Sequence, residues 1–173
     1  MGKNLTLTGM MGVGKSTIGK ILAKKLEYNF IDIDKLIEDK EGLSINLIFK
    51  NKGESHFRKI ENEMTLTELR RENSVISLGG GAFLNNIIRK NAKKLSISFW
   101  LDVPIEELIK RLRKSKQRPL LLKQKTSEAV KKIYFERKKI YNTADYRIKC
   151  KSLKSEEIVN RILNLYEKSG SQI

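Results

Sequence analysis

A phosphate-loop pattern near the start of the chain limits its possible folds more than any other feature. Residues 9–16 read GMMGVGKS and fit the pattern G-x-x-x-x-G-K-[ST]. Residues 3–8 alternate polar and apolar side chains, which predicts a strand, and residues 16–26 carry apolar side chains at helical spacing. A strand, a glycine-rich loop and a helix in this order are the context that such a loop requires. They disfavour the alternative, a chance glycine turn before a basic helix.

The loop predicts a binding site for the phosphates of a nucleotide. Its glycines let the backbone curl so that N–H groups point at phosphate oxygens, and the following helix adds unpaired N–H groups. Lys15 can reach the β- and γ-phosphates, and the Ser16 hydroxyl can ligate Mg²⁺. The candidate nucleotide-binding residues of this segment are Gly12, Val13, Gly14, Lys15, Ser16 and Thr17.

Length and composition indicate one globular unit. A chain of 173 residues with 39% hydrophobic residues can build a substantial core, so we expect a single domain over residues 1–173. Cys150 is the only cysteine, which excludes an internal disulfide. No apolar run is long enough to span a bilayer, and the chain enters the first strand without a signal peptide. We therefore expect a cytoplasmic protein, without membrane contact, that acts as a monomer.

The net charge of +16 allows two interpretations. It could indicate a nucleic-acid site. However, the basic residues are spread along the predicted helices with acidic residues between them, and no basic stripe is interleaved with aromatic residues. We therefore favour a generally lysine-rich surface, without a nucleic-acid partner. Its positive field would also attract anionic substrates.

The remaining hydrophobic patterns alternate between strands and helices. Strands are expected at residues 28–32, 73–78, 95–101 and 146–150. Helices are expected at residues 35–40, 43–71, 104–112, 126–141 and 155–167. This order predicts an α/β fold, a P-loop three-layer sandwich in which helices flank a five-stranded parallel sheet.

Asp32 and Asp34 follow the second predicted strand. In a strand-like arrangement alternate side chains share a face, so both carboxylates would face the phosphate crevice at the carboxyl end of a parallel strand. One could hold a Mg²⁺-bound water, and the other could contact a substrate hydroxyl. The alternative is that Asp34 only caps the helix at 35–40. The neighbouring phosphate loop favours the functional interpretation.

Arg58 and three consecutive glycines are candidates for binding a second substrate. Arg58 follows Phe57, a predicted packing anchor, and the fork of an arginine side chain grips a carboxylate through two hydrogen bonds. The alternative is a solvated helix arginine. Directly after a core strand come Gly79, Gly80 and Gly81. They permit close approach of the backbone to a ligand, with a flexible turn as the alternative.

Residues 113–124 are strongly basic and are interrupted by Pro119 between two predicted helices. This predicts a mobile lid that closes over anionic phosphates and carries Arg118. The alternative is a solvated basic loop. The helix expected after this segment carries a further candidate, Arg137.

Taken together, these motifs resemble the shikimate kinase family over nearly the whole chain. Besides the phosphate loop, the ordered set comprises D-I-D at 32–34, F-R at 57–58, G-G-G at 79–81, R-P-L-L at 118–121 and F-E-R…Y-x-x-A-D-Y at 135–146. Many families share the phosphate loop, whereas this set in this order is specific. In that family, ATP phosphorylates the 3-hydroxyl of shikimate and gives shikimate 3-phosphate and ADP. This is a step of chorismate and aromatic amino-acid biosynthesis.

The resemblance implies roles on the nucleotide side of the site. Lys15 and the amides of residues 12–14 hold the ATP phosphates. Ser16 ligates Mg²⁺, and Asp32 acts on the metal through a water. Arg118 reaches the transferring phosphate from the lid, and Arg111 lies against adenine.

The resemblance implies a second set of roles on the acceptor side. Asp34 contacts the shikimate hydroxyls and acts as the base. Arg58 and Arg137 bind the shikimate carboxylate. Backbone contacts come from the glycines Gly79, Gly80 and Gly81. The substrate-binding helices would then cover residues 33–71.

Two other functions are weighed against this one. A kinase of the same architecture could act on another small molecule or on a nucleoside monophosphate. A non-catalytic nucleotide-binding module could instead recruit nucleic acid through its positive charge. A GTPase is disfavoured because the sequence has no N-K-x-D motif. Asp34, Arg58 and Arg137 separate the classes, because a pure binding module needs no acceptor site.

Overall fold

The computed structural model describes residues 3–114 and 127–170 of the chain. Their strands form one five-stranded sheet in the order β2-β3-β1-β4-β5, and all neighbouring strands are parallel. The strands are β1 (Asn4–Thr8), β2 (Asn29–Asp32), β3 (Ser74–Ser77), β4 (Ser96–Asp102) and β5 (Tyr146–Lys149). The predicted five-stranded parallel sheet is thus confirmed, and each predicted strand begins and ends within one residue of the observed one.

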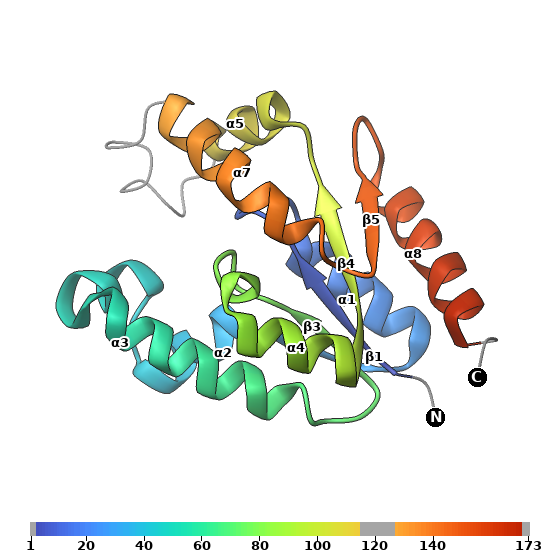
Figure 1. Ribbon diagram of the computed structural model, residues 1–173, viewed down its shortest axis with the longest axis horizontal. Coiled ribbons are helices and arrows are strands. Elements are labelled where there is room, and N and C mark those ends of the chain that lie inside the picture. Colours follow the sequence, from blue (N-terminus) through green and yellow to red (C-terminus); the bar gives the residue numbers. More distant parts are fainter. Residues whose placement is uncertain (1–2, 115–126, 171–173) are drawn as a thin grey trace.

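Helices cover both faces of the sheet and complete a three-layer α/β sandwich (Figure 1). They are α1 (Lys15–Leu26), α2 (Ile33–Glu41), α3 (Ile45–Glu68), the 3₁₀ turn η1 (Ala82–Leu84), α4 (Asn86–Leu95), α5 (Ile105–Lys114), α7 (Ser127–Tyr141) and α8 (Ser155–Gly170). Helices α1 and α8 pack together on one face, whereas α4 covers the other face beside α3.

Both faces of the sheet carry apolar side chains that pack against the covering helices, so the sheet is buried, as is usual for parallel sheets. In β3 the adjacent residues Val75 and Ile76, which point to opposite faces of the sheet, are completely inaccessible to solvent. In the central strand β1, Leu5 and Leu7 are equally buried on one face. The core also contains the largest side chains of β4, Phe99 and Trp100. Helix α1 packs closely against the sheet at Gly19, because this residue has no side chain: a β-carbon there would lie 2.4 Å from the Phe30 ring.

The candidate functional segments meet at one edge of the sheet. The phosphate loop follows β1, Asp32 ends β2, and the three glycines follow β3. The carboxyl ends of parallel strands lie at the same edge, so these segments come together although they are far apart in the sequence. The topology therefore provides a crevice at the point where ligands bind in open α/β sheets.

Two parts of the chain differ most from the expected helices. The helix expected at 43–71 is broken at Gly53, whose φ of 82° and ψ of 168° are not helical. The pair η1 and α4 was not expected. The start of α4 is fixed by Asn85, whose side chain accepts hydrogen bonds from the amides of Ile87 at 2.8 Å and Ile88 at 3.4 Å.

Candidate active site

The phosphate loop folds as its sequence predicts. Gly12 and Gly14 have φ values of 80° and 99°, which side chains other than glycine rarely adopt, and Gly14 immediately precedes α1. The Lys15 side chain is buried, and its Nζ donates hydrogen bonds to the carbonyls of Gly9 at 2.9 Å and Met10 at 3.1 Å. The ammonium group is thus folded back over the loop to which it belongs.

Ser16 and Asp32 are in direct contact. The Ser16 hydroxyl donates a hydrogen bond of 2.5 Å to Oδ2 of Asp32. Oδ1 of Asp32 accepts from the Lys35 amide at 3.3 Å, so Asp32 rather than Asp34 caps α2. The strand-like arrangement expected for residues 32–34 is therefore wrong, because the helix already begins at Ile33.

A hydroxyl beside a carboxylate is a donor set that suits Mg²⁺. The ion prefers oxygen ligands and is usually held by one or two protein groups together with substrate phosphates and water. Within the described ranges no group of three or more His, Cys, Asp or Glu side chains could hold a metal ion. A site with few protein ligands is therefore the kind that Ser16 and Asp32 could form.

One cavity joins the phosphate loop to both carboxylates and to the glycine loop. It has a volume of about 220 Å³, and its lining includes Lys15, Ser16, Asp32, Asp34 and Gly80. A neighbouring cavity of about 400 Å³ shares the Ser16 and Asp side chains and extends between α2 and the start of α3. Asp34 thus faces the same space as Asp32, although it lies in the first turn of α2.

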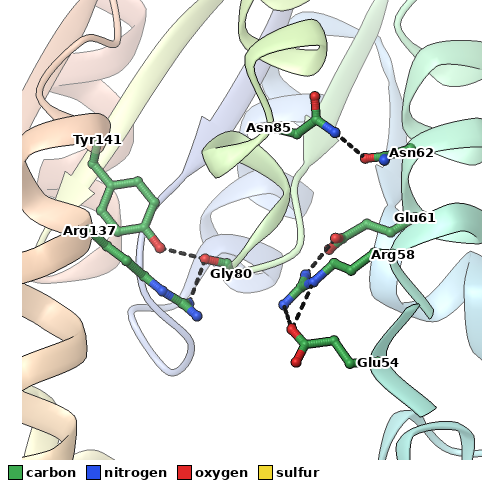
Figure 2. Close-up of polar contacts among 8 residues, drawn as sticks. All are labelled: Glu54, Arg58, Glu61, Asn62, Gly80, Asn85, Arg137 and Tyr141. Carbon is green, nitrogen blue, oxygen red and sulfur yellow. Dashed lines mark hydrogen bonds and ion pairs between the residues drawn. The ribbon is translucent and has the colours of Figure 1, made fainter. Parts of the chain in front are cut away.

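Arg58 is fixed by neighbours on its own helix, α3. Its Nη1 donates to Oε2 of Glu61 at 2.6 Å, and its Nη2 donates to Oε1 of Glu54 at 3.2 Å (Figure 2). Its guanidinium lies 5.2 Å from the ring centroid of Phe57, which is buried as predicted. A β-carbon at Gly81 would lie 2.5 Å from Nη1 of Arg58. The side chain is therefore not the solvated helix arginine of the alternative interpretation.

Glu61 is part of the site, and the sequence reasoning missed it. Its side chain is 1% exposed, and Oε1 accepts no hydrogen bond from the described residues. Burial raises the pKa of its carboxyl, the Arg58 guanidinium opposes this, and the charge of Asp34 adds to the increase. A β-carbon at Gly79 would lie 2.3 Å from Oε1 of Glu61 and 2.8 Å from Oδ1 of Asp34. Gly79 thus separates two carboxylates. The signal that could have found Glu61 in the sequence is its position three residues after Arg58 on one predicted helix, where the two side chains can form an ion pair.

Arg137 approaches the glycine loop from the opposite side. Its Nη1, on α7, donates to the Gly80 carbonyl at 3.0 Å. The hydroxyl of Tyr141 donates to the same carbonyl at 2.5 Å. Figure 2 shows Arg137 and Arg58 on the two sides of the glycine loop, pointing toward it from different helices. The two arginines predicted to bind a carboxylate are therefore brought together at residues 79–81.

The remaining predicted residues lie around the nucleotide side. Thr17 lines the same cavity as Lys15. Arg111, on α5, donates to the carbonyl of Val13 at 3.3 Å and also pairs with Glu107, so it lies beside the phosphate loop. Arg118, together with most of the predicted lid at 113–124, lies outside the described residues.

The comparisons with known proteins agree with this arrangement. The family model for shikimate kinase matches residues 11–167. The chain belongs to the shikimate kinase family. It is 43% identical over 165 residues to the shikimate kinase of Sulfurihydrogenibium sp., covering 93% of this chain and 96% of the relative.

Solved structures give the same family. The shikimate kinase from Acinetobacter baumannii in complex with shikimate has a TM-score of 0.92 and 31% identity, covering 98% of this chain and 95% of that one. A gluconokinase from Sinorhizobium meliloti, with a TM-score of 0.62 and 16% identity over 98% of this chain and 97% of its own, shares the fold alone. The chain is therefore a kinase of the shikimate pathway that uses ATP. None of the helices in the ranges 3–114 and 127–170 is long and apolar enough to cross a membrane.

Proposed function

We propose that the active site at the carboxyl edge of the sheet transfers the γ-phosphoryl group of ATP to the 3-hydroxyl of shikimate. The products are shikimate 3-phosphate and ADP. The observation that carries this proposal is the approach of Arg58 and Arg137 to one glycine loop, whose Gly80 lines the cavity of the phosphate loop. A carboxylate-bearing acceptor fits between two arginines from different helices.

The phosphate loop binds ATP in this proposal. The amides of residues 12–14 point at phosphate oxygens, and Lys15 exchanges its loop carbonyls for the β- and γ-phosphates. Thr17 contributes from the first turn of α1, and Arg111 lies against adenine. Arg118 is assigned to the transferring phosphate on the family resemblance alone.

Ser16 and Asp32 would hold Mg²⁺, Ser16 directly and Asp32 through a water. Their contact of 2.5 Å brings a hydroxyl and a carboxylate together in the lining of the cavity. When bound, the ion neutralises charge on the β- and γ-phosphates. The two side chains themselves fix where the phosphates lie relative to Asp34.

Asp34, Arg58, Arg137 and the glycine loop bind the acceptor. The two arginines hold the carboxylate, and the backbone of Gly79, Gly80 and Gly81 closes the site around the ring. Asp34 then accepts hydrogen bonds from the shikimate hydroxyls and takes the proton of the attacking 3-hydroxyl as the base. Its place in the shared cavity supports this role.

Positioning and neutralisation of charge account for most of the catalysis. Phosphoryl transfer proceeds with little covalent chemistry for the protein, so rigidly placed cations contribute the main stabilisation. Lys15 is buried and doubly hydrogen-bonded, and Arg58 is held by two acidic residues. Arg58 therefore needs little reorganisation when ligands bind, whereas Lys15 only exchanges its loop carbonyls for phosphate oxygens. A monomeric state, a cytoplasmic location and a single domain over residues 1–173 remain predictions from the sequence.

The test is a coupled assay of ADP release with Mg²⁺–ATP and one of three acceptors: shikimate, gluconate or AMP. We expect acceptor-dependent ADP release with shikimate only. Turnover with AMP or gluconate and none with shikimate would instead support another kinase of this architecture. No ADP release with any acceptor would support a non-catalytic binding module.

A further inference from the structure

The Gly80 carbonyl accepts hydrogen bonds from two donors of one helix. Tyr141 donates at 2.5 Å and Arg137 at 3.0 Å, and both lie on α7 (Figure 2). Residues four positions apart on a helix share a face, so both side chains reach the glycine loop from the same direction. A carbonyl oxygen has two lone pairs, and here both are used. Because Tyr141 already donates to this oxygen, the carbonyl keeps a hydrogen bond when the one from Arg137 is lost.

The Tyr141 hydroxyl is rigidly placed. The residue is completely buried, and its ring centroid lies 6.1 Å from that of Trp100 in the core. Burial raises the pKa of the phenol, against the opposing charge of Arg137, so the group is a protonated donor at neutral pH. Its position is set by the core and not by the ligands of the site.

We propose that Tyr141 is a positioning residue that keeps the Gly80 carbonyl hydrogen-bonded while Arg137 turns to the acceptor carboxylate. In this proposal the Nη1–Nη2 edge of Arg137 grips the carboxylate, so the bond from Nη1 to Gly80 is lost or shared. Without the Tyr141 hydroxyl, this partly buried carbonyl would lose its last donor among the described residues each time an acceptor binds. That loss would weaken acceptor binding and leave nucleotide binding unchanged, because the nucleotide does not contact Arg137 in the proposed function. The inference rests on the proposed role of Arg137.

The opposite end of the loop is held independently. Asn85 donates to Asn62 of α3 at 3.1 Å, so the segment after the glycines is tied to α3. The loss of one hydroxyl on α7 should therefore not release the whole loop. The effect expected for Tyr141 is local and specific to the acceptor.

The test measures the acceptor KM, the ATP KM and kcat for Tyr141→Phe, which keeps the ring and removes only the hydroxyl. We expect the acceptor KM to rise about tenfold, since binding then leaves a carbonyl without a donor. The ATP KM should change less than about twofold. The control is Tyr166→Phe, which removes a hydroxyl that donates to the Lys3 carbonyl at 2.6 Å in a remote part of the fold. It should leave both KM values unchanged.

A double-mutant comparison separates this role from a general structural one. In an Arg137→Ala background no arginine has to leave the carbonyl, so adding Tyr141→Phe should change kcat/KM less than about twofold. An equal loss in both backgrounds would overturn the inference. Replacement of Tyr141 by 4-aminophenylalanine keeps a donor and should restore the acceptor KM, which also gives a result if the phenylalanine variant folds poorly.

The failure of this inference is distinct from failure of the proposed function. If the wild-type protein phosphorylates shikimate but Tyr141→Phe has an unchanged acceptor KM, only the role of Tyr141 is wrong. If the wild-type protein does not phosphorylate shikimate, the proposed function fails and the role of Tyr141 falls with it.

Discussion

The guanidinium of Arg58 lies so close to Gly81 that a β-carbon at position 81 would come within 2.5 Å of Nη1 and 2.7 Å of Nη2. The backbone of Gly81 has a φ of −110° and a ψ of −14°, which other residues adopt readily. A side chain at position 81 would therefore conflict with the position of the arginine and not with the turn.

The first prediction is that Gly81→Ala displaces Arg58. The acceptor KM should rise about tenfold, because a displaced fork loses one of its two hydrogen bonds to a carboxylate, and the ATP KM should stay unchanged. Steady-state kinetics with each substrate varied provides the check. In an Arg58→Lys background the same change should cost less, because the guanidinium is absent. Full additivity of the two variants would contradict this explanation.

The second prediction concerns Asp32. Asparagine caps helices as well as aspartate does, so Asp32→Asn should retain α2 while removing the negative charge beside Ser16. The Mg²⁺ concentration for half-maximal activity should rise about ten- to a hundredfold, as is typical when a residue that supports a metal is lost. A titration of activity with Mg²⁺, with thermal unfolding as the control for folding, measures this. An unchanged Mg²⁺ requirement would exclude Asp32 from the metal site.

The third prediction concerns Lys15. Lys15→Ala should lower kcat about a hundred- to a thousandfold, the usual effect of removing one preorganised donor from a charged transition state. The measurement is kcat at saturating ATP and shikimate, with circular dichroism to show that the variant is folded. Near-normal kcat in a folded variant would refute the proposed role of the phosphate loop.

The fourth prediction uses the thiol of Cys150. Burial raises its pKa from the ordinary 9.0 to about 12, and the charge of Asp102 acts in the same direction. Since the folded thiol stays protonated while the unfolded thiol ionises near pH 9, this group favours the folded state fully below pH 9 and loses that contribution as the pH rises toward 12.

Alkylation by iodoacetamide at pH 8.5 should therefore be slow in the native protein and fast in guanidinium chloride. Mass spectrometry of the modified chain follows both rates. Rapid labelling under native conditions, with no loss of structure, would show that Cys150 is neither buried nor held as a thiol.

The sequence predicted those features that local patterns determine. The phosphate loop and the five strands are encoded by glycine placement and short hydrophobic runs, and each was located within one residue. Arg58 and Gly79–Gly81 were singled out from residue type and position, the family resemblance gave Arg137 its role, and the structure brings all of them together. Their proximity itself depends on how β3, α3 and α7 pack, which no local pattern specifies.

Other features could not be predicted because their causes are tertiary. Glu61 is a helix acid like many others in the sequence until burial and Arg58 give it a place in the site. Tyr141 stands in the motif at 135–146, but the sequence does not show its contact with Gly80. Gly53 interrupts α3, although the helical pattern continues on both sides. The cap at Asp32 was not predicted, and Asp34 was weighed as a cap only in the disfavoured alternative, because the helix was expected to start two residues later.

The central claim is that the two arginines and Asp34 present the 3-hydroxyl of shikimate to the γ-phosphate of ATP. The most direct test is phosphorus and proton NMR of the reaction of the protein with Mg²⁺–ATP and shikimate. The account predicts one new phosphomonoester, coupled to the proton on carbon 3, formed in equal amount to ADP. A phosphoester on another hydroxyl, or inorganic phosphate and ADP without any phosphoester, would contradict it.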